Sequence, residues 1–385
     1  MSELRPSDVV VIGAGVVGAA CAHYAARAGL SVTVLDRGPV AGGTTGAGEG
    51  NLLVSDKRPG PELSLALLSL RLWAELAAEG HDFEYQAKGG LIVARTEAEA
   101  VAMTVAAEAQ RACEVSAHTV DAKELHFYEP HLAPDLAGGT HYPQDAQVQP
   151  ALAAAALLRS GVRLHTGVTV TGFRRGRGDR VLGVRTSHGD IAAGAVVNAA
   201  GTWSGAIAEL AGVSLPILPR RGFVLVTEPL PPIVRHKVYA AAYTGDVASD
   251  DADLASSAVV EGTPSGTVLI GASRERVGFD PSFPVPVLRR LAAQAIELFP
   301  ILAGVSVLRA YRGFRPYCPD HLPVVGPDPR APGLLHACGH EGAGVGLAPA
   351  TGLLITRALT GDASGPDPGV DPTPFAPTRF AEVSS

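Results

Sequence analysis

Apolar and polar positions near the N-terminus follow two different periods. Residues 9–12 form a short run of apolar, β-branched residues, which predicts a strand buried on both faces. Gly13 predicts a turn, the small residues of 15–28 predict a helix, and residues 31–35 predict a second strand. A strand, a tight turn, a helix and a strand within about 30 residues indicate a βαβ unit with a right-handed crossover.

The rest of the chain alternates between helix-like and strand-like segments. Helices are expected at residues 63–79, at 97–112, from Pro150 onward, at 287–299 and at 348–360. Strands are expected at residues 162–166, 168–174, 181–187, 191–198, 222–228, 257–261, 267–272, 305–312 and 333–338. The βαβ start, the β-rich middle and the glycine-rich return near the end predict two interleaved domains rather than two consecutive ones.

Length, composition and charge narrow the class of protein. The 385 residues are enough for two domains, and a chain that is 46% apolar and 18% charged is too apolar to be disordered. The net charge is −7 without a basic stripe, so no nucleic-acid partner is expected. The four Cys form no CxxC pair, which excludes a disulfide scaffold and a thiolate zinc site and favours the cytoplasm. No His-x-x-x-His pair or carboxylate cluster suggests a metal site.

Two segments resemble a membrane-spanning or secretory segment and a phosphate-binding patch, but we interpret both differently. Residues 9–26 contain no Asp, Glu, Lys or Arg, but glycines and a histidine interrupt them and Asp8 precedes them, so no transmembrane or secretory segment is expected. The basic run 174–180 is interpreted as a solvated hairpin turn rather than a phosphate-binding patch, because Asp179 and two glycines break it.

The first chemical signal is a GxGxxG motif at the turn of the βαβ unit. Gly13 allows the tight turn, Gly15 lets the backbone approach a pyrophosphate, and Gly18 lets the helix and strand pack closely. The N-terminus of the helix offers unpaired N–H groups to that pyrophosphate. Asp36 ends the second strand, where an acid accepts hydrogen bonds from ribose hydroxyls and argues against NADP. The motif therefore predicts a site for FAD or NAD.

Two further glycine-rich segments favour FAD. Thr44 and Thr45 lie in the loop 41–50, which has five Gly and can wrap a flavin's pyrophosphate and ring. Residues 338–346 again follow a predicted strand and precede a predicted helix. Such a junction can direct N–H groups and a helix dipole at the flavin N1–C2=O edge, which becomes negative on reduction.

These motifs resemble those of the D-amino acid oxidase type of FAD-dependent oxidoreductases, whose members include glycine oxidase, sarcosine oxidase β-type subunits and D-hydroxyproline dehydrogenase. The resemblance covers nearly the whole chain. It is carried by residues 11–18, 44–45, 197–203, 313–316, 320–326 and 339–340. The loop 46–54 and the stretch 339–342 are most similar to D-hydroxyproline dehydrogenase-type catalytic subunits, some of which work in heteromeric complexes.

The resemblance implies an α/β fold, α+β in its second domain, in which a Rossmann-like FAD-binding domain is interleaved with a β-rich substrate domain. The expected FAD-binding domain is discontinuous and comprises residues 1–85, 145–220 and 318–363. The expected substrate-binding domain comprises residues 86–144 and 221–317. Residues 364–385, rich in Pro, Asp and Ser, are expected to be a poorly ordered tail.

The resemblance also implies non-covalent FAD. Cys318 does not match the flavin-linked cysteine of monomeric sarcosine oxidases, and Gln144 and its neighbours replace the histidine that binds a second flavin in sarcosine oxidase β-type subunits. The expected FAD contacts are Gly13, Gly15, Val16, Val17, Gly18, Asp36, Arg37, Thr44, Thr45, Gly50, Asn51, Leu52, Val168, Ala200, Gly201, Trp203, Gly313, Arg315, Gly339, His340, Gly342, Gly344 and Val345.

In this family the flavin N5 takes a hydride from the carbon that bears the substrate nitrogen, and water hydrolyses the imine product. Arg315 matches the family's carboxylate-binding arginine, and a planar guanidinium can hold a carboxylate with two hydrogen bonds. His340 and Glu341 are expected beside the flavin, either as catalytic proton partners or as helix caps. Tyr239 and Tyr243 are both candidates for a tyrosine near the substrate.

The choice of substrate follows from smaller signals. Glu49 and Asn51 can reach the substrate from the opposite loop, which suits a hydroxylated or cyclic amino acid. Glycine oxidase-like relatives carry a second arginine where Gly342 and Ala343 stand here, so glycine is not the expected substrate.

The predicted function is FAD-dependent oxidation of an amino-acid C–N bond, in a D-amino acid or a cyclic imino acid such as D-hydroxyproline. Two alternatives stay open. The first is a 2-hydroxy-acid dehydrogenase, which would also use Arg315, and the second is a flavoprotein subunit that acts only with partners. Besides the small substrate, electron-transfer subunits are candidate partners.

Overall fold

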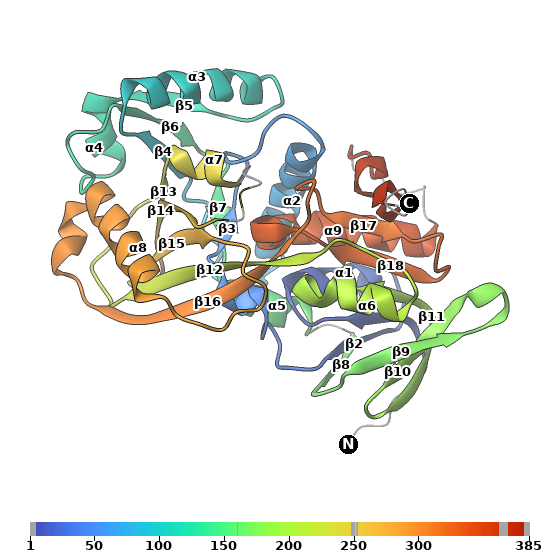
Figure 1. The fold of residues 1–385 in the computed structure, drawn as a ribbon. Helices are drawn as coiled ribbons and strands as arrows, with labels where there is room; N and C mark the ends of the chain where they lie inside the picture. Colours follow the sequence, from blue (N-terminus) through green and yellow to red (C-terminus); the bar gives the residue numbers. More distant parts are fainter. Residues whose placement is uncertain (1–4, 160, 248–250, 252, 362–368, 381–385) are drawn as a thin grey trace.

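The computed structural model describes residues 5–159, 161–247, 251, 253–361 and 369–380. Within them, the strands form two eight-stranded sheets and one two-stranded pair. Figure 1 shows the two sheets in separate halves of the molecule, with helices α2 (Pro61–Ala78) and α9 (Gly344–Thr360) between them. This arrangement confirms the predicted α/β class.

The first sheet has the order β17-β18-β11-β1-β2-β8, and the hairpin of β9 and β10 joins it through β11. β1 pairs in parallel with both β2 and β11, as expected for strands joined by a crossover helix. The bounds are β1 Ser7–Ile12, β2 Val32–Asp36, β8 Val162–Thr166, β9 Val170–Arg175, β10 Val181–Thr186, β11 Gly189–Asn198, β17 Val324–Pro327 and β18 Leu334–Cys338. The segment 9–26, which imitated a membrane span, is β1, a turn and most of helix α1 (Val16–Arg27).

Helix α9 packs against α1 and α2 as a core helix. A side chain at Gly352 would meet the backbone of Ala20 at 2.7 Å, so glycine lets α9 approach α1 closely. The stretch Glu341–Thr360 is also the candidate for a membrane span, with 20 residues and a mean hydropathy of 1.2 in its apolar window. Because 61% of that window is buried inside the fold, a core helix accounts for it. Two shorter helices, α5 (Pro150–Leu157) and α6 (Ser204–Leu210), complete this half.

The second sheet is largely antiparallel and has the order β16-β12-β15-β14-β13-β4-β6-β5. Helix α8 (Val285–Leu298) covers it with Val287, Leu291, Ala295 and Leu298, which share one helical face. The strand bounds are β4 Gly90–Ala94, β5 His118–Asp121, β6 Gly138–Tyr142, β12 Leu218–Thr227, β13 Lys237–Ala240, β14 Ala255–Gly262, β15 Val268–Arg274 and β16 Val307–Tyr317. The other helices of this half are α3 Glu97–Arg111, α4 Leu125–Tyr128 and α7 Ala242–Val247.

The short pair β3 (Asn51–Leu52) and β7 (Ala146–Gln147) ties the glycine-rich loop to the segment that returns from the second sheet. Strands of the first sheet come from residues 7–36, 162–198 and 324–338, and those of the second from 90–142 and 218–317. The chain therefore passes between the sheets repeatedly, as the colours of Figure 1 show. The residue limits given above for the FAD-binding and substrate-binding domains remain a prediction.

Most expected elements are present, with shifted ends. Each expected helix exists, and the basic run 174–180 connects β9 and β10 as a hairpin. Strands β12 and β16 are longer than expected, so Arg315 lies within β16 rather than beyond it. The short strands β4 to β6 and β13 were not predicted, because each has only four or five residues, and β5 and β6 contain few apolar ones.

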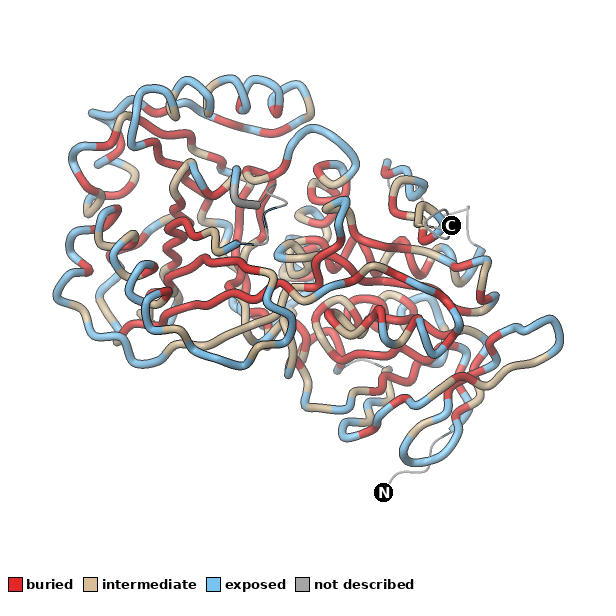
Figure 2. The backbone as a smooth tube through the Cα atoms, in the orientation of Figure 1, coloured by how far each residue is buried: buried red, intermediate tan, exposed pale blue. Residues whose placement is uncertain are grey.

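Figure 2 shows buried residues concentrated in the strands and in the helices between the two sheets, whereas α3 and the tip of the β9–β10 hairpin are largely exposed. The C-terminal segment differs from the expected poorly ordered tail over residues 369–380. Phe375 is fully buried there, and Arg379 Nε lies 2.6 Å from Asp320 Oδ2. The remainder of the predicted tail, 364–368 and 381–385, lies outside the described residues.

Candidate functional site

A cavity of about 540 Å³ is lined by residues of both sheets. Its walls include the turn after β1, the end of β2, the loop 42–49, the start of α9 and parts of β12 and β16. A large, well-formed cavity with a few converging polar groups is the usual place for a ligand. Its two ends have different chemistry.

At the nucleotide end, close packing leaves room only for glycine. Gly13 has φ +114°, and a Cβ there would lie 2.3 Å from the carbonyl oxygen of Ala199. A Cβ on Gly18 would lie 2.0 Å from the carbonyl oxygen of Gly13, which explains how α1 packs so close to β1. Gly15 precedes the first residue of α1, so the N-terminus of that helix opens onto the cavity.

Asp36 fixes the turn and keeps acceptor capacity. Its Oδ2 accepts a hydrogen bond from Ala14 N at 2.8 Å, and its Oδ1 accepts one from Gly38 N at 2.7 Å. A carboxylate can accept about four hydrogen bonds, so two lone-pair sites remain for ribose hydroxyls. Because Asp36 also lines the cavity, this arrangement fits an adenosine ribose.

Thr44 and Thr45 hold the loop rather than pointing free hydroxyls into the cavity. Thr45 Oγ1 accepts a hydrogen bond from Val16 N at 3.1 Å. Thr44 and Thr202 both donate to the carbonyl oxygen of Phe314, at 2.6 and 2.7 Å. These contacts tie the loop to the start of α1 and to β16, and they join the two halves of the cavity wall.

The structure places most of the expected FAD contacts on the cavity wall. Those that line it are Gly13, Gly15, Val16, Val17, Asp36, Arg37, Thr44, Thr45, Asn51, Val168, Ala200, Gly201, Trp203, Gly313, Arg315, His340, Gly342, Gly344 and Val345. Four expected contacts are not on the wall, namely Gly18, Gly50, Leu52 and Gly339. Gly50 lies behind the wall because its backbone packs on Val148, where a Cβ would meet the carbonyl oxygen at 1.8 Å.

Arg315 lies at the opposite end of the cavity. Its Nη1 donates to the carbonyl oxygen of Ser273 at 2.7 Å, and the residue lines the cavity. A Cβ on Gly222 would lie 2.2 Å from that Nη1, so the absence of a side chain there makes room for the guanidinium. Burial, followed by the nearby charge of Arg274, lowers the pKa of Arg315 to about 10. An anionic ligand would relieve both effects.

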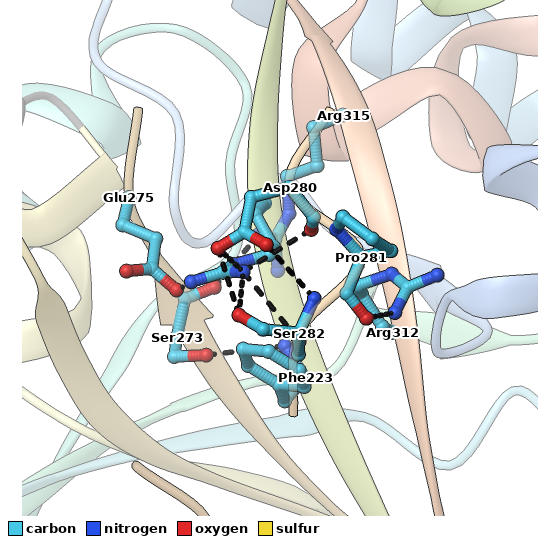
Figure 3. A network of polar contacts seen from close by, with 9 residues as sticks. Phe223, Ser273, Glu275, Asp280, Pro281, Ser282, Arg312 and Arg315 are labelled. Carbon is cyan, nitrogen blue, oxygen red and sulfur yellow. Dashed lines mark hydrogen bonds and ion pairs between the residues drawn. The ribbon is translucent and has the colours of Figure 1, made fainter. Parts of the chain in front are cut away.

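A polar network holds the loop 275–284 against the strands that carry Arg315 (Figure 3). Arg221 Nε donates to Glu275 at 2.8 Å, and its Nη1 donates to Asp280 at 2.6 Å and to Ser282 Oγ at 2.9 Å. Arg312 donates to the carbonyl oxygen of Pro281. These bonds fix the segment that follows Ser273, and therefore the position of the backbone oxygen that Arg315 binds.

Glu49 and Asn51 bring acceptor atoms to the same end. Glu49 is 9% exposed, and among the described residues no hydrogen bond reaches its Oε1. Burial raises the pKa of Glu49, although the ammonium of Lys237, 3.9 Å from Oε1, acts against this shift. Asn51 Oδ1 is likewise buried without a hydrogen-bond partner within the described part of the chain. Both residues line the cavity, so two side chains with acceptor atoms lie on the wall of this end.

The two candidate tyrosines lie at different depths. Tyr243 lines the cavity, and its ring centroid is 5.3 Å from that of Tyr239. Tyr239 is fully buried behind it and is hydrogen-bonded to Ser55, which also contacts the buried Asp145. Of the pair, Tyr243 is therefore the candidate for substrate contact.

His340 and Glu341 line the cavity, but their contacts disfavour a role as proton partners, and neither side chain makes a capping hydrogen bond at the helix starts beside it. His340 Nε2 lies 2.9 Å from Thr351 Oγ1, and burial lowers the pKa of His340 to about 3, which keeps the ring neutral. Burial alone would raise the pKa of Glu341, yet a hydrogen bond from His321 and the charge of Arg220, 2.7 Å away, lower it to about 2. Groups with these pKa values exchange protons poorly near pH 7.

The thiols on and near the wall are protonated. Cys318 is fully buried, does not line the cavity, and burial raises its pKa well above the ordinary value. Cys338, which the sequence did not single out, does line the cavity, but burial raises its pKa to about 12. The side chain of Gln144 is hydrogen-bonded to the backbone of Ser116 and Glu114. Within the described ranges, no three His, Cys, Asp or Glu side chains gather as metal ligands.

Three buried cations near the Arg315 end of the cavity, which we call the substrate end, were not predicted from the sequence. Arg220 pairs with Glu341, Lys237 pairs with Glu261, and Arg274 lies against Tyr243. Arg274 and Lys237 stand in strongly apolar strands, where a single charged residue is a usable signal of a buried ion pair or ligand contact. The partners themselves are far away in sequence, so spacing did not indicate them.

Comparison with known proteins agrees with this geometry. The family model described as FAD dependent oxidoreductase, DAO, matches residues 8–358. The chain is 33% identical to glycine oxidase of Pseudomonas putida, covering 96% of this chain and 98% of that protein. It is 30% identical to hydrogen cyanide synthase subunit HcnC of Pseudomonas aeruginosa, covering 98% and 97%.

Solved structures show the same fold. Glycine oxidase from Geobacillus kaustophilus matches with a TM-score of 0.87 and 28% identity, over 98% of this chain and 99% of that one. L-proline dehydrogenase from P. horikoshii matches with a TM-score of 0.88 at 24% identity and the same coverage, which speaks for the fold alone. FAD is therefore the cofactor that the glycine turn, Asp36 and the cavity accommodate. The chain belongs to the DAO family of FAD-dependent oxidoreductases.

Proposed function

We propose that this protein oxidises the C–N bond of a small amino or imino acid. The observation that carries the proposal is the guanidinium of Arg315 on the same cavity wall as the buried acceptors of Glu49 and Asn51. One cation for the α-carboxylate and acceptors for the N–H groups are the complement of an amino acid. The similarity to glycine oxidase over nearly the whole chain supports this assignment.

The protein's own residues would mainly bind and orient. Gly13, Gly15 and the start of α1 would hold the FAD pyrophosphate, and Asp36 the ribose. Bound FAD supplies the hydride acceptor for the carbon that bears the nitrogen, which leaves an imine for water to hydrolyse. Arg315 would hold the α-carboxylate with two hydrogen bonds and so fix that carbon in one position. Glu49 Oε1 would accept a hydrogen bond from the substrate nitrogen.

The finer proposal concerns the substrate's additional group. Glu49 Oε1 and Asn51 Oδ1 are two acceptors without a partner among the described residues, and two is the number of N–H groups on a protonated secondary amine, whereas glycine and D-alanine have three. This match supports a cyclic imino acid such as D-hydroxyproline. A site that leaves polar groups unpaired with the simpler analogue discriminates against it. The same two acceptors also disfavour a 2-hydroxy acid, because its 2-hydroxyl offers one donor for the two of them.

The electron acceptor and location are part of the same proposal. A relative at 30% identity is by name a synthase subunit, which supports a partner subunit as the acceptor in place of oxygen. The free Cys21, Cys113, Cys318 and Cys338 suit a cytoplasmic protein. Oxygen uptake during turnover, measured with and without an artificial electron acceptor, distinguishes oxygen from a protein partner.

Anaerobic bleaching of the bound flavin tests the function. The purified protein, mixed in a stopped-flow instrument with cis-4-hydroxy-D-proline, D-proline, sarcosine, glycine, D-alanine and D-lactate, should lose its absorbance near 450 nm fastest with a cyclic imino acid. Fastest reduction by glycine or D-alanine would overturn the cyclic substrate and keep C–N oxidation. Bleaching by D-lactate alone would replace the amino-acid function with the hydroxy-acid alternative.

A further inference from the structure

A second, smaller cavity adjoins the substrate end. It has a volume of about 20 Å³ and is lined by residues of the segment 51–57, by Tyr243 and by residues at the start of α9. Asn51, Tyr243 and Gly342 line both cavities, so the small cavity lies directly beside the large one. Such a volume has room for about one water molecule. The small cavity can therefore take one hydroxyl-sized group of a ligand.

Gly342 keeps the boundary between the two cavities thin. A Cβ on Gly342 would have the Cδ and Nε atoms of Arg315 as its nearest neighbours, both at 3.5 Å. Arg315 is the residue proposed to hold the α-carboxylate of the substrate. A substrate bound to Arg315 would therefore have the small cavity beside it, with no side chain on the intervening glycine.

Asp56 and Lys57 supply the charged groups of the small cavity. Their side chains are 7% and 6% exposed, and Lys57 Nζ lies 3.1 Å from Asp56 Oδ1 and 3.3 Å from Glu62 Oε1. This ion pair leaves Asp56 Oδ1 without a hydrogen bond from any described residue. Gln110 donates to the backbone oxygens of Ser55 and Lys57, at 3.0 and 2.7 Å, so the segment that carries both charged side chains is fixed.

The charges around the small cavity favour a neutral group of the ligand. Burial alone would lower the pKa of Lys57, but the carboxylates of Asp56 and Glu62 raise it well above its ordinary value, so Lys57 stays protonated. One ammonium beside two carboxylates leaves no positive charge that an acid group of the ligand would balance. A hydroxyl suits this setting, because it can donate to a carboxylate oxygen and accept from an ammonium N–H.

We propose that Asp56 and Lys57 form a subsite for a ring hydroxyl, and that the substrate is a cyclic imino acid whose hydroxyl enters the small cavity. This inference rests on the proposed function, in which Arg315 holds the α-carboxylate. The hydroxyl would donate to Asp56 Oδ1 and accept from Lys57 Nζ. An unsubstituted ring leaves both groups without this partner, so the site should discriminate against it.

Matched ligands test the subsite in the FAD-loaded protein. We expect one epimer of 4-hydroxy-D-proline to reduce the flavin about 10- to 100-fold more efficiently than D-proline, the range of one hydrogen bond to a charged group. The corresponding 4-fluoro-D-proline has no O–H to donate and should behave like D-proline. Binding without turnover is a second readout. 4-Hydroxytetrahydrofuran-2-carboxylate, in which oxygen replaces the ring nitrogen, should perturb the oxidised flavin spectrum at lower concentration than tetrahydrofuran-2-carboxylate.

Variants of Asp56 test the polar contact. Asp56→Ala removes the acceptor and leaves Lys57 its ion pair with Glu62, so it should lower the efficiency with the hydroxylated ligand toward that with D-proline. Asp56→Asn keeps an acceptor oxygen and should retain part of the preference. Asp82→Ala removes an exposed carboxylate outside both cavities and should leave the preference intact.

Gly346→Ala tests the space rather than the polar groups. Gly346 lines the small cavity and not the large one, and a Cβ there would meet the backbone of residues 51–53 at 3.4 Å or more, which is ordinary contact. The added methyl group on this wall should reduce the preference for the hydroxylated ligand. If Asp56→Ala does not retain FAD, this variant and the wild-type ligands decide.

Equal efficiency of D-proline and both 4-hydroxy epimers in the wild type would overturn the inference and leave the small cavity to a bound water, while the proposed function would stand. An unchanged preference in Asp56→Ala would also overturn it, as would a 4-fluoro ligand that matches the hydroxylated one. Preferential binding of the hydroxylated tetrahydrofuran carboxylate, together with no flavin reduction by any amino or imino acid, would support the subsite and overturn the proposed function instead.

Discussion

The two ends of the cavity use different parts of the chain. At the nucleotide end, Gly13, Gly18 and Asp36 act through backbone geometry and backbone hydrogen bonds, all within one βαβ unit. At the substrate end, the side chains of Glu49 and Arg315 line the same cavity although they lie far apart in the sequence, and Arg315 is held by a hydrogen bond to Ser273 on another strand. The nucleotide end depends on glycines that have no Cβ, and the substrate end depends on where charged side chains lie. Variants at the two ends should therefore fail in different ways.

The largest effect is expected at Gly13. Gly13→Ala places a Cβ 2.3 Å from the carbonyl oxygen of Ala199 at φ +114°, so strain and overpacking together should cost about 2–6 kcal/mol and prevent FAD binding. Flavin content after purification and the free energy of unfolding in urea measure this. Gly29→Ala is the matched control, because Gly29 also has a positive φ, +86°, but open space around it. It should cost only about 1–2 kcal/mol and keep FAD. Equal losses in the two variants would show that close packing at the turn is not what matters.

At the substrate end, a substitution should spare the cofactor and remove turnover. Arg315→Lys keeps the charge but loses the planar fork, which should reduce kcat/KM by about 2–4 kcal/mol, roughly 30- to 1,000-fold. Flavin content should stay normal. Arg309→Lys, on the same strand, changes an exposed side chain that does not line the cavity, and it should alter kcat/KM by less than about threefold. Unchanged turnover in Arg315→Lys would mean that the carboxylate is held elsewhere.

An intermediate effect is expected at Asp36, whose side chain holds the turn at the nucleotide end. Asp36→Ala removes the acceptor for the ribose and the acceptors for Ala14 N and Gly38 N, so the Kd for FAD should rise about 10- to 100-fold. Asp36→Asn keeps one acceptor oxygen and should lose less. Titration of the flavin-free protein with FAD, followed by quenching of flavin fluorescence, measures both. Equal Kd values for wild type and Asp36→Ala would remove Asp36 from the ribose site.

The same contrast explains what could be predicted from the sequence. The βαβ unit, its glycines and Asp36 were predicted because they lie within about 30 residues. In so short a unit the spacing along the sequence determines where the residues lie in space. Arg315 was found only through resemblance to a family, since nothing local distinguishes it from Arg312. The strand that carries it was predicted to end at residue 312, because the glycine and proline that follow suggest a turn.

The rest of the substrate end depends on tertiary contacts that spacing does not encode. Whether Tyr239 or Tyr243 faces the cavity is decided by α7, an element that the apolar pattern did not reveal. Arg274 comes to lie against Tyr243 through strand pairing in a sheet whose order differs from chain order. The sequence left Glu341 as either a proton partner or a helix cap, because its ion pair with Arg220 lies 121 residues away and spacing does not indicate it. The fold brings together charged side chains that are far apart in the sequence, so the partner of each charged residue could not be predicted from one sequence.

The smallest expected effect is a change with pH in the free energy of unfolding. It arises from Asp145, which contacts Ser55 beneath Tyr239, behind the substrate end. Asp145 is fully buried, and although a hydrogen bond from Ser55 opposes it, burial raises the pKa of Asp145 to about 7 from an ordinary value near 4. The folded protein therefore binds this proton more tightly than the unfolded chain. The resulting stability is present at pH 4 and is lost as pH rises toward 7. Buried histidines act in the opposite sense, because burial lowers the pKa of His141 to about 4, so their contribution is lost as pH falls.

Comparison with Asp145→Asn isolates the carboxyl from these histidines. Asn can still accept the hydrogen bond from Val54 N that Oδ1 accepts at 2.8 Å, and it carries no ionisable proton. Relative to the wild type, Asp145→Asn should gain about 1–3 kcal/mol of unfolding free energy between pH 4 and pH 8, a discounted fraction of the full linkage. Urea unfolding at several pH values, with the exposed Asp135→Asn as control, measures the difference. Parallel curves for wild type and Asp145→Asn would mean that Asp145 is ionised in the folded protein, and that the support beneath Tyr239 includes a buried charge rather than a neutral hydrogen-bonded acid.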